Sequence, residues 1–139
     1  MATTVLYTPE VLGLAIELAH YPLSEALPLR GDARSRTCGS SIVLGLEADA
    51  AGVVQRIGLR CQACAIGQAA AALFARGAAG RDAAQIAAAR DAIGAWLAGE
   101  APLPDWPGLE TIAAARDYPA RHGAVMLPWD AAVAALCAR

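Results

Sequence analysis

Apolar and polar residues alternate along two neighbouring segments in the first half of the chain. In the first segment, residues 41–48, Ile42, Leu44 and Leu46 share one face, which is typical of a half-buried strand. The second segment follows a short connection at residues 49–52. Its alternating positions are Val53, Gln55, Ile57 and Leu59. Two such segments joined by a short connection predict a β-hairpin.

Most of the remaining chain has a helical pattern. Thr8, Pro9 and Glu10 form a helix start, with an N-cap, a proline at the first helical position and an acid in the first turn. This helix should end near Pro22, because proline cannot continue it. Further helices are expected at residues 65–76, 82–98 and 109–116, and a last one from Leu127 or Pro128 to Arg139. Residues 23–36 predict an extended segment with a turn, a strand at the edge of a sheet.

A pair of cysteines stands where the second strand pattern ends and a helix pattern begins. Cys61 and Cys64 are separated by two residues, a spacing that lets both sulfur atoms reach one centre. The N-terminus of a helix carries partial positive charge and unpaired N–H groups, so we expect this position to favour thiolate over thiol. Alone, the pair suits half of a zinc or iron site, a thioredoxin-like redox couple or two buried cysteines. The antiparallel hairpin before it disfavours the redox couple.

The predicted hairpin brings a third thiol to this pair. Residue 41 should lie near residue 60, so Cys38 emerges at the same end of the sheet as Cys61 and Cys64. Three thiols at one end of a sheet favour the metal-site interpretation.

Other residues are weaker candidates for the same site. His122 lies in a predicted turn between the last two helices, and its imidazole would suit a tetrahedral site that lacks a fourth ligand. Cys137, on the final helix, is expected to be a small apolar filler. Arg36, Arg60 and Arg121 flank the proposed site, where they are either solvated or stabilise neighbouring thiolates.

Composition narrows the class of partner. The chain has 139 residues, with 11 Lys+Arg against 13 Asp+Glu and a formal net charge of −2. That balance argues against nucleic acid or an acidic membrane surface as the main partner. No apolar run is long enough for a membrane span, and the N-terminal segment lacks the basic region of a secretory signal. We therefore expect one domain over residues 1–139 in the cytoplasm, where cysteines are reduced, metal-bound or catalytic.

Three motifs follow one another along the chain. Cys38-Gly39-Ser40 precedes the strand pattern, residues 61–70 read CQACAIGQAA, and residues 121–129 read RHGAVMLPW. In this order they resemble the motifs of the NifU/IscU/SufU iron–sulfur scaffold family. Those motifs are Cys-Gly-Asp before Ile-x-Leu-x-Leu, then Gly-x-Gly-Cys-Ala-Ile-Ser-x-Ala-Ser, then Arg-x-x-Cys-x-x-Leu-x-Trp. The long connection before the third motif is closer to the SufU-like branch.

The resemblance implies an α+β fold, with a small antiparallel sheet (the hairpin plus an edge strand), helices packed on one face, and a metal or thiol site at one end. Family members assemble a [2Fe–2S] cluster from iron and persulfide sulfur that a cysteine desulfurase delivers, and pass it to apo iron–sulfur acceptor proteins. They act as scaffolds rather than as enzymes. SufU-like members instead hold Zn²⁺ and accept sulfur on a cysteine. A homodimer around a shared cluster is an open alternative.

Two family ligands are retained and two are replaced. By the resemblance, Cys38 and Cys64 correspond to the first and second ligand cysteines. Ser40 stands at the position of the family aspartate, so a carboxylate ligand is missing. Ala124 stands at the position of the third cysteine.

Two other residues offer compensation for these losses. Cys61 stands where the family has glycine, and His122 lies two residues before the missing third cysteine. We therefore hypothesise a relocated site formed by Cys38, Cys61, Cys64 and His122. A thiolate in place of a carboxylate makes a site softer and favours a retained zinc or a stable cluster. Three hypotheses follow: a cluster scaffold, a zinc-bound sulfur acceptor, or a degenerate member that acts only through protein contacts.

Overall fold

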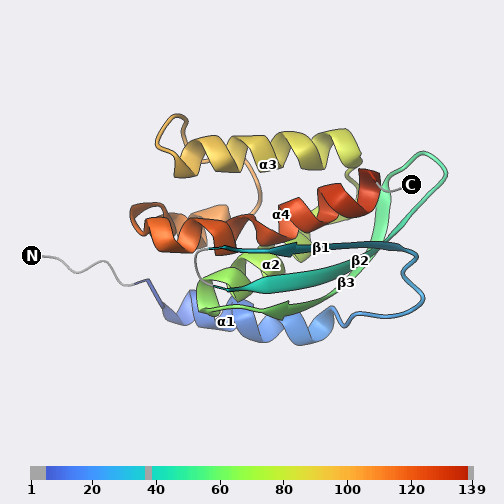
Figure 1. Cartoon of the computed structure of the whole chain (residues 1–139), viewed down its shortest axis with the longest axis horizontal. Helices are drawn as coiled ribbons and strands as arrows, with labels where there is room; N and C mark the ends of the chain where they lie inside the picture. Colours follow the sequence, from blue (N-terminus) through green and yellow to red (C-terminus); the bar gives the residue numbers. More distant parts are fainter. Residues whose placement is uncertain (1–5, 37–38, 138–139) are drawn as a thin grey trace, which may run out of the picture.

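The computed structural model describes residues 6–36 and 39–137 (Figure 1). In chain order its elements are α1 (Pro9–Glu17), the 3₁₀ helix η1 (Leu18–His20), β1 (Leu29–Arg34), β2 (Ser41–Ala48), β3 (Val54–Gln62), α2 (Ala65–Ala78), α3 (Ala83–Leu97), the 3₁₀ helices η2 (Leu109–Asp117) and η3 (Pro119–Arg121), and α4 (His122–Cys137). None of the helices in these described ranges is long and apolar enough to cross a membrane.

The three strands form an antiparallel sheet in the order β1–β2–β3. The predicted hairpin is β2 and β3, and the predicted edge strand is β1. Arg34 pairs with Ser41, and Ser41 pairs with Gln62. The end of β1, the start of β2 and the end of β3 therefore lie together at one end of the sheet.

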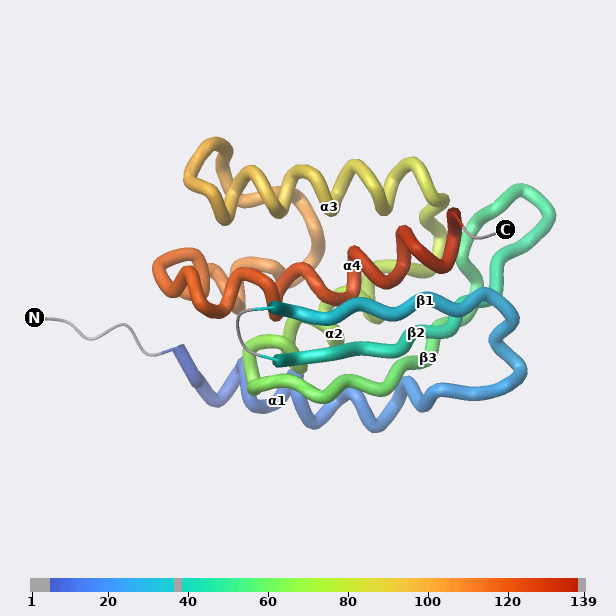
Figure 2. The backbone as a smooth tube through the Cα atoms, viewed as in Figure 1, coloured from blue at the N-terminus to red at the C-terminus, as the bar shows by residue number. Residues whose placement is uncertain are grey.

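The helices cover one face of this sheet, and the core lies between the two layers. Ile42, Leu44 and Leu46 point from β2 into the core and are at most 1% exposed. α4 packs against β1 and β2, α2 packs against β3, α1 lies beside α2, and α3 lies beside α4 (Figure 2). This arrangement confirms the predicted α+β fold with helices on one face.

Three aromatic side chains join α2 to α4 at the centre of the core. Phe74 of α2 stacks on Trp106 with ring centroids 5.6 Å apart, and Trp129 of α4 meets both rings edge-on. Trp106 Nε1 donates a hydrogen bond to the Leu73 carbonyl at 2.8 Å. Burial of three large rings fixes α4 against α2 and so sets where the first turns of both helices lie.

A bulge corrects the predicted alternation at the start of β3. Ala48 pairs with Val54, and Gln55 is left as the extra residue before pairing continues. Val54 is fully buried whereas Gln55 is exposed, so the alternation predicted to resume at Val53 and Gln55 is wrong at the start of β3. The cause is the connection: the Asp49 carboxylate accepts the Val53 N–H at 3.0 Å, which holds Val53 in the turn.

The final helix begins earlier than the sequence predicted. α4 starts at His122 rather than at Leu127 or Pro128, and Pro128 lies within it. A proline inside a helix removes one backbone hydrogen bond and costs about 3 kcal/mol. Packing of α4 against α2, α3 and the sheet offsets that cost. The predicted helix at residues 109–116 is the 3₁₀ helix η2, with a kink at Ile112.

Candidate thiol and metal site

Cys61 and Cys64 lie on either side of the junction between β3 and α2; residues 61–64 are called the thiol turn below. Cys61 is in β3 and pairs with Ile42 of β2. Directly opposed residues share a face, so Cys61 points to the helix-covered side of the sheet and packs against the core. Cys64 is the N-cap of α2. The structure confirms the predicted strand-to-helix turn, and both thiols are half-buried.

Gln68 and Gly67, in the first turn of α2, fix the shape of the thiol turn. The Gln68 side-chain amide donates to the Ala63 carbonyl at 3.0 Å, and its backbone N–H donates to the Cys64 carbonyl at 3.0 Å. A Cβ at Gly67 would lie 2.6 Å from the Cβ of Ala63, so glycine lets the turn fold back on the helix. Sequence reasoning missed both residues. The available signal was a glycine in the first turn of a predicted helix.

Cys38 lies outside the described residues, but the chain on either side of it reaches the same end of the sheet. The Ser35 N–H donates to the Ser40 carbonyl at 2.8 Å, beyond the last pairs of β1 and β2. The neighbouring pair is Ser41 with Gln62, and Gln62 belongs to the thiol turn. The flanks of Cys38 therefore approach the thiol turn as predicted, and the role of Cys38 itself stays a prediction.

Ala124 lies against the first turn of α2. A Cβ at Gly67 would be 3.2 Å from the Ala124 Cβ and 3.6 Å from the Ala124 oxygen. The Ala124 side chain is fully buried, and Pro128 has no N–H to donate to the Ala124 carbonyl four residues earlier. The position that resembles the family's third cysteine is thus next to the thiol turn, but it offers a methyl group. Ser40, at the position of the family aspartate, is 5% exposed and neutral.

His122 is the first residue of α4, which corrects its predicted placement in a turn. Its Nε2 lies 2.7 Å from the Arg116 carbonyl oxygen, so Nε2–H donates to that oxygen. Two residues along a helix differ by about 200° around its axis. His122 and Ala124 therefore point to nearly opposite sides of α4.

The described residues do not by themselves complete a metal site. Over residues 6–36 and 39–137, no three His, Cys, Asp or Glu side chains lie close enough together to hold a metal ion. Cys61, Cys64 and His122 are thus not a three-ligand group. The hypothesised set also contains Cys38, which lies outside these ranges, so the four-residue site stays a prediction.

The protonation of Cys61 differs from what its sequence position predicts. Its thiol pKa is raised to about 11, chiefly because burial disfavours the charged form and further because of charge on Cys64. The predicted thiolate bias is therefore wrong for Cys61, because this residue faces the core from β3 and precedes the helix N-cap. A metal that binds Cys61 must displace its proton.

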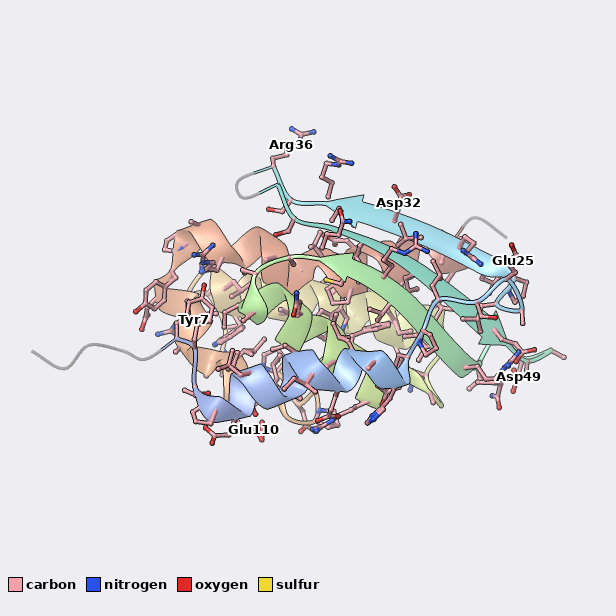
Figure 3. The ribbon with its side chains drawn as sticks, turned by 90° about the horizontal axis from the view of Figure 1, so that it is seen from below. Tyr7, Glu25, Asp32, Arg36, Asp49 and Glu110 are labelled. Carbon is pink, nitrogen blue, oxygen red and sulfur yellow. The ribbon has the colours of Figure 1, made fainter. Side chains whose placement is uncertain are left out.

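The flanking arginines do not offset this burial. Arg60 pairs with Val43, one register position from Cys61 and so on the opposite, solvent-facing side of the sheet. Arg36 follows β1 and points away from the sheet end (Figure 3). Burial and Cys64, and no arginine, account for the raised pKa of Cys61.

A cavity of about 340 Å³ lies between α1, α2 and η2, away from the thiol turn. Its lining residues are Glu10, Gly13, Leu14, Glu17, Arg76 and Thr111. Arg76 Nε donates to Glu17 Oε1 at 2.9 Å across it. An ion pair therefore occupies part of its lining, and the cavity contains no thiol.

Comparisons with known proteins place these features in a family context. No protein-family model matches the sequence, and no curated protein matches it. The N-terminal part of a nitrogen-fixing NifU-like protein from Brucella abortus is 30% identical, over 95% of this chain and 92% of that one, with a TM-score of 0.85. A protein from the thermophile Fervidobacterium islandicum is described as an iron–sulfur cluster assembly scaffold for the SUF system. It is 17% identical over 94% of this chain and 96% of that one, with a TM-score of 0.84, which shows the shared fold alone.

Proposed function

The chain belongs to the NifU-like family, and we propose that it is a scaffold for the assembly of iron–sulfur clusters. The observation that carries the proposal is 30% identity to a NifU-like protein over 95% of the chain, with two thiols at the sheet end where the family motif falls. A scaffold supplies ligands and docking, while iron and sulfur come from outside. The protein would therefore not be an enzyme.

Cys38 and Cys64 are the residues proposed to hold the nascent cluster, because thiolates are the usual ligands of iron–sulfur clusters. Cys64 is the N-cap of α2, where backbone N–H groups favour a negatively charged ligand. Cys61 and His122 are proposed as additional ligands. They would replace the family aspartate and the family's third cysteine, which this chain lacks. Recruitment of Cys61 would release a proton, so metal affinity should rise with pH.

A retained zinc ion is the second candidate cargo. The observation that favours it is the donor set: Cys61 adds a thiol, and Ser40 supplies no carboxylate. Zn²⁺ is bound well by several thiolates and an imidazole, and a softer donor set releases its metal less readily. The chain would then be a zinc-bound sulfur acceptor similar to SufU.

The proposed partners follow from the same role. Sulfur would arrive as a persulfide from a cysteine desulfurase in the cytoplasm, and a finished cluster would leave to apo iron–sulfur acceptor proteins. A homodimer around a shared cluster is compatible with a site at the end of the sheet. The alternative is a degenerate family member that acts through protein contacts alone. Ala124 favours this alternative, because its methyl group cannot bind a metal at the position of the family's third cysteine.

Anaerobic purification followed by metal analysis tests the proposal. The visible spectrum is recorded, and iron, zinc and acid-labile sulfide are measured per chain. Absorbance with equimolar iron and sulfide supports the scaffold, and a colourless protein with one zinc per chain supports the sulfur acceptor. If the protein contains neither iron nor zinc under reducing conditions, the scaffold and the sulfur acceptor are both contradicted. The degenerate member that acts only through protein contacts is then the remaining hypothesis.

A further inference from the structure

The two thiols of the thiol turn are neighbours, and two neighbouring thiols can exchange sulfur as well as bind a metal. Cys61 is the next-to-last residue of β3, Cys64 three residues later is the N-cap of α2, and both side chains pack against the same core. Within the described ranges the remaining cysteine is Cys137, exposed at the end of α4. Cys137 lies about 20 Å along that helix from Ala124 at 1.5 Å per residue. Among the described cysteines, Cys61 is therefore the one that can react with a group carried on Cys64.

The two thiols differ in how they are held. Cys61 is fixed in β3 by its pairing with Ile42 and faces the core. Cys64 has extended backbone angles at the start of α2, and its side chain makes no capping hydrogen bond. Its sulfur is thus not committed to the helix N–H groups and is the better placed of the two to meet an incoming donor.

The second thiol of this pair is a departure from the resembling motif. Cys61 stands where the resembling motif has glycine, and Ala124, against Gly67, offers no thiol on the other side of the turn. A sulfur atom loaded on Cys64 therefore has Cys61 as its reaction partner among the described residues.

We propose that Cys61 is a resolving thiol for sulfur loaded on Cys64, so that the thiol turn converts a sulfane sulfur into sulfide. The inference rests on the proposed function, because a persulfide-bearing donor is its source of sulfur. Sulfide is the form in which sulfur enters an iron–sulfur cluster, and the reaction would release it beside the metal-binding thiols.

The step that releases sulfide involves only the two cysteines and the sulfur atom loaded on Cys64. Cys61 attacks as its thiolate, which the raised pKa makes scarce, and its fixed place three residues from Cys64 offsets this scarcity. It attacks Cys64 Sγ, and a Cys61–Cys64 disulfide forms as the bond from Cys64 Sγ to the sulfane sulfur breaks. The sulfane sulfur leaves with the electron pair of that bond, and with the Cys61 proton it becomes hydrogen sulfide. The sulfane sulfur is reduced, and the two cysteine sulfurs are oxidised to the disulfide. A dithiol reductant then returns the disulfide to two thiols and is itself oxidised.

Inorganic tetrasulfide tests the proposal on the metal-free, reduced chain. After brief exposure and rapid desalting, released sulfide is measured over time, and cysteine states are read by alkylation and mass spectrometry. The variants are Cys61→Ser, with Cys61→Ala as a second form in case serine disturbs the core, Cys64→Ser, and Cys137→Ser as the control. Circular dichroism checks that each is folded.

Wild type and Cys137→Ser should release about one sulfide per chain and acquire the Cys61–Cys64 disulfide. Both Cys61 variants should keep a persulfide on Cys64 and release sulfide at least about tenfold more slowly. Release at the wild-type rate from the Cys61 variants, or a wild-type persulfide that persists without a disulfide, would overturn the resolving role. A wild-type chain that binds metal but keeps its persulfide contradicts only this inference. One that takes up no sulfane sulfur contradicts sulfur reception as well.

Discussion

Gly67 of α2 lies directly against Ala124 of α4, so close that a Cβ on Gly67 would be 3.2 Å from the Ala124 Cβ. Two residues far apart in the sequence thus meet at the first turn of α2, directly after the thiol turn. A methyl group thus stands beside this turn at a position where the resembling motif has a thiol. It also makes this point of the fold sensitive to one added carbon atom.

Gly67→Ala should destabilise the protein by about 1–3 kcal/mol, because the added Cβ would lie 2.6 Å from the Ala63 Cβ and force the thiol turn or α4 to move. Gly94→Ala is the matched control. A Cβ there meets only Met126 Cε at 3.9 Å, so alanine should stabilise α3 by roughly 0.5–1 kcal/mol. Urea denaturation measures both changes in the free energy of unfolding. Equal effects of the two substitutions would contradict the close contact at Gly67.

Cys61 should resist alkylation at neutral pH in the metal-free protein. With its pKa raised to about 11, the thiolate fraction at pH 8 is about two hundredfold smaller than for a thiol of ordinary pKa. Iodoacetamide labelling followed by mass spectrometry should give a Cys61 rate that climbs through pH 10 without a plateau. A plateau near pH 9 would show that burial does not hold the proton.

The same pKa makes stability depend on pH. The folded state holds the Cys61 proton more tightly than the unfolded chain, in which a thiol titrates near pH 8.5. This contribution is fully present below that pH and is lost as pH rises toward 11. Urea midpoints of wild type and Cys61→Ala should therefore differ in their slope between pH 8.5 and pH 10, with wild type losing more stability. Equal slopes for the two proteins would contradict the raised pKa of Cys61.

Ala124→Cys should raise metal retention, because it places a thiol beside the first turn of α2 at the position of the family's third cysteine. After reconstitution with ferrous iron and sulfide, or with zinc, and then exposure to a chelator, the variant should keep at least about twice the metal per chain of wild type, because an added thiolate ligand tightens binding. Ala132→Cys, a fully buried position about 12 Å further along α4, is the control and should leave retention unchanged. The prediction fails if both variants retain metal alike.

Local signals made much of the fold predictable. The Thr8 hydroxyl accepts the Val11 N–H at 3.1 Å as the N-cap of α1, and Asp82 with Gln85 forms a capping box at the start of α3. The period-two pattern gave the bounds of β2. Each of these features depends on residues close together in sequence, so the physical cause can be read directly from the chain.

Features that depend on tertiary packing were not predictable in the same way. Pro128 suggested a helix start, but neighbouring elements keep the helix intact on both sides of it. The raised pKa of Cys61 comes from burial under the helices, and the role of Gly67 comes from the approach of α4. At the site, the sequence identified the thiol turn itself. It could not identify the spatial relations of His122, because these depend on where α4 begins.

The loading of iron and sulfide on Cys64 tests the central claim most directly. Wild type, Cys64→Ser and the distant control Cys137→Ser are reconstituted anaerobically, and iron and acid-labile sulfide are counted per chain. Wild type and Cys137→Ser should bind equal amounts with the same visible absorbance, and Cys64→Ser should lose at least about nine-tenths of both, because a thiolate ligand is gone. Wild-type loading of the Cys64→Ser chain would contradict the account.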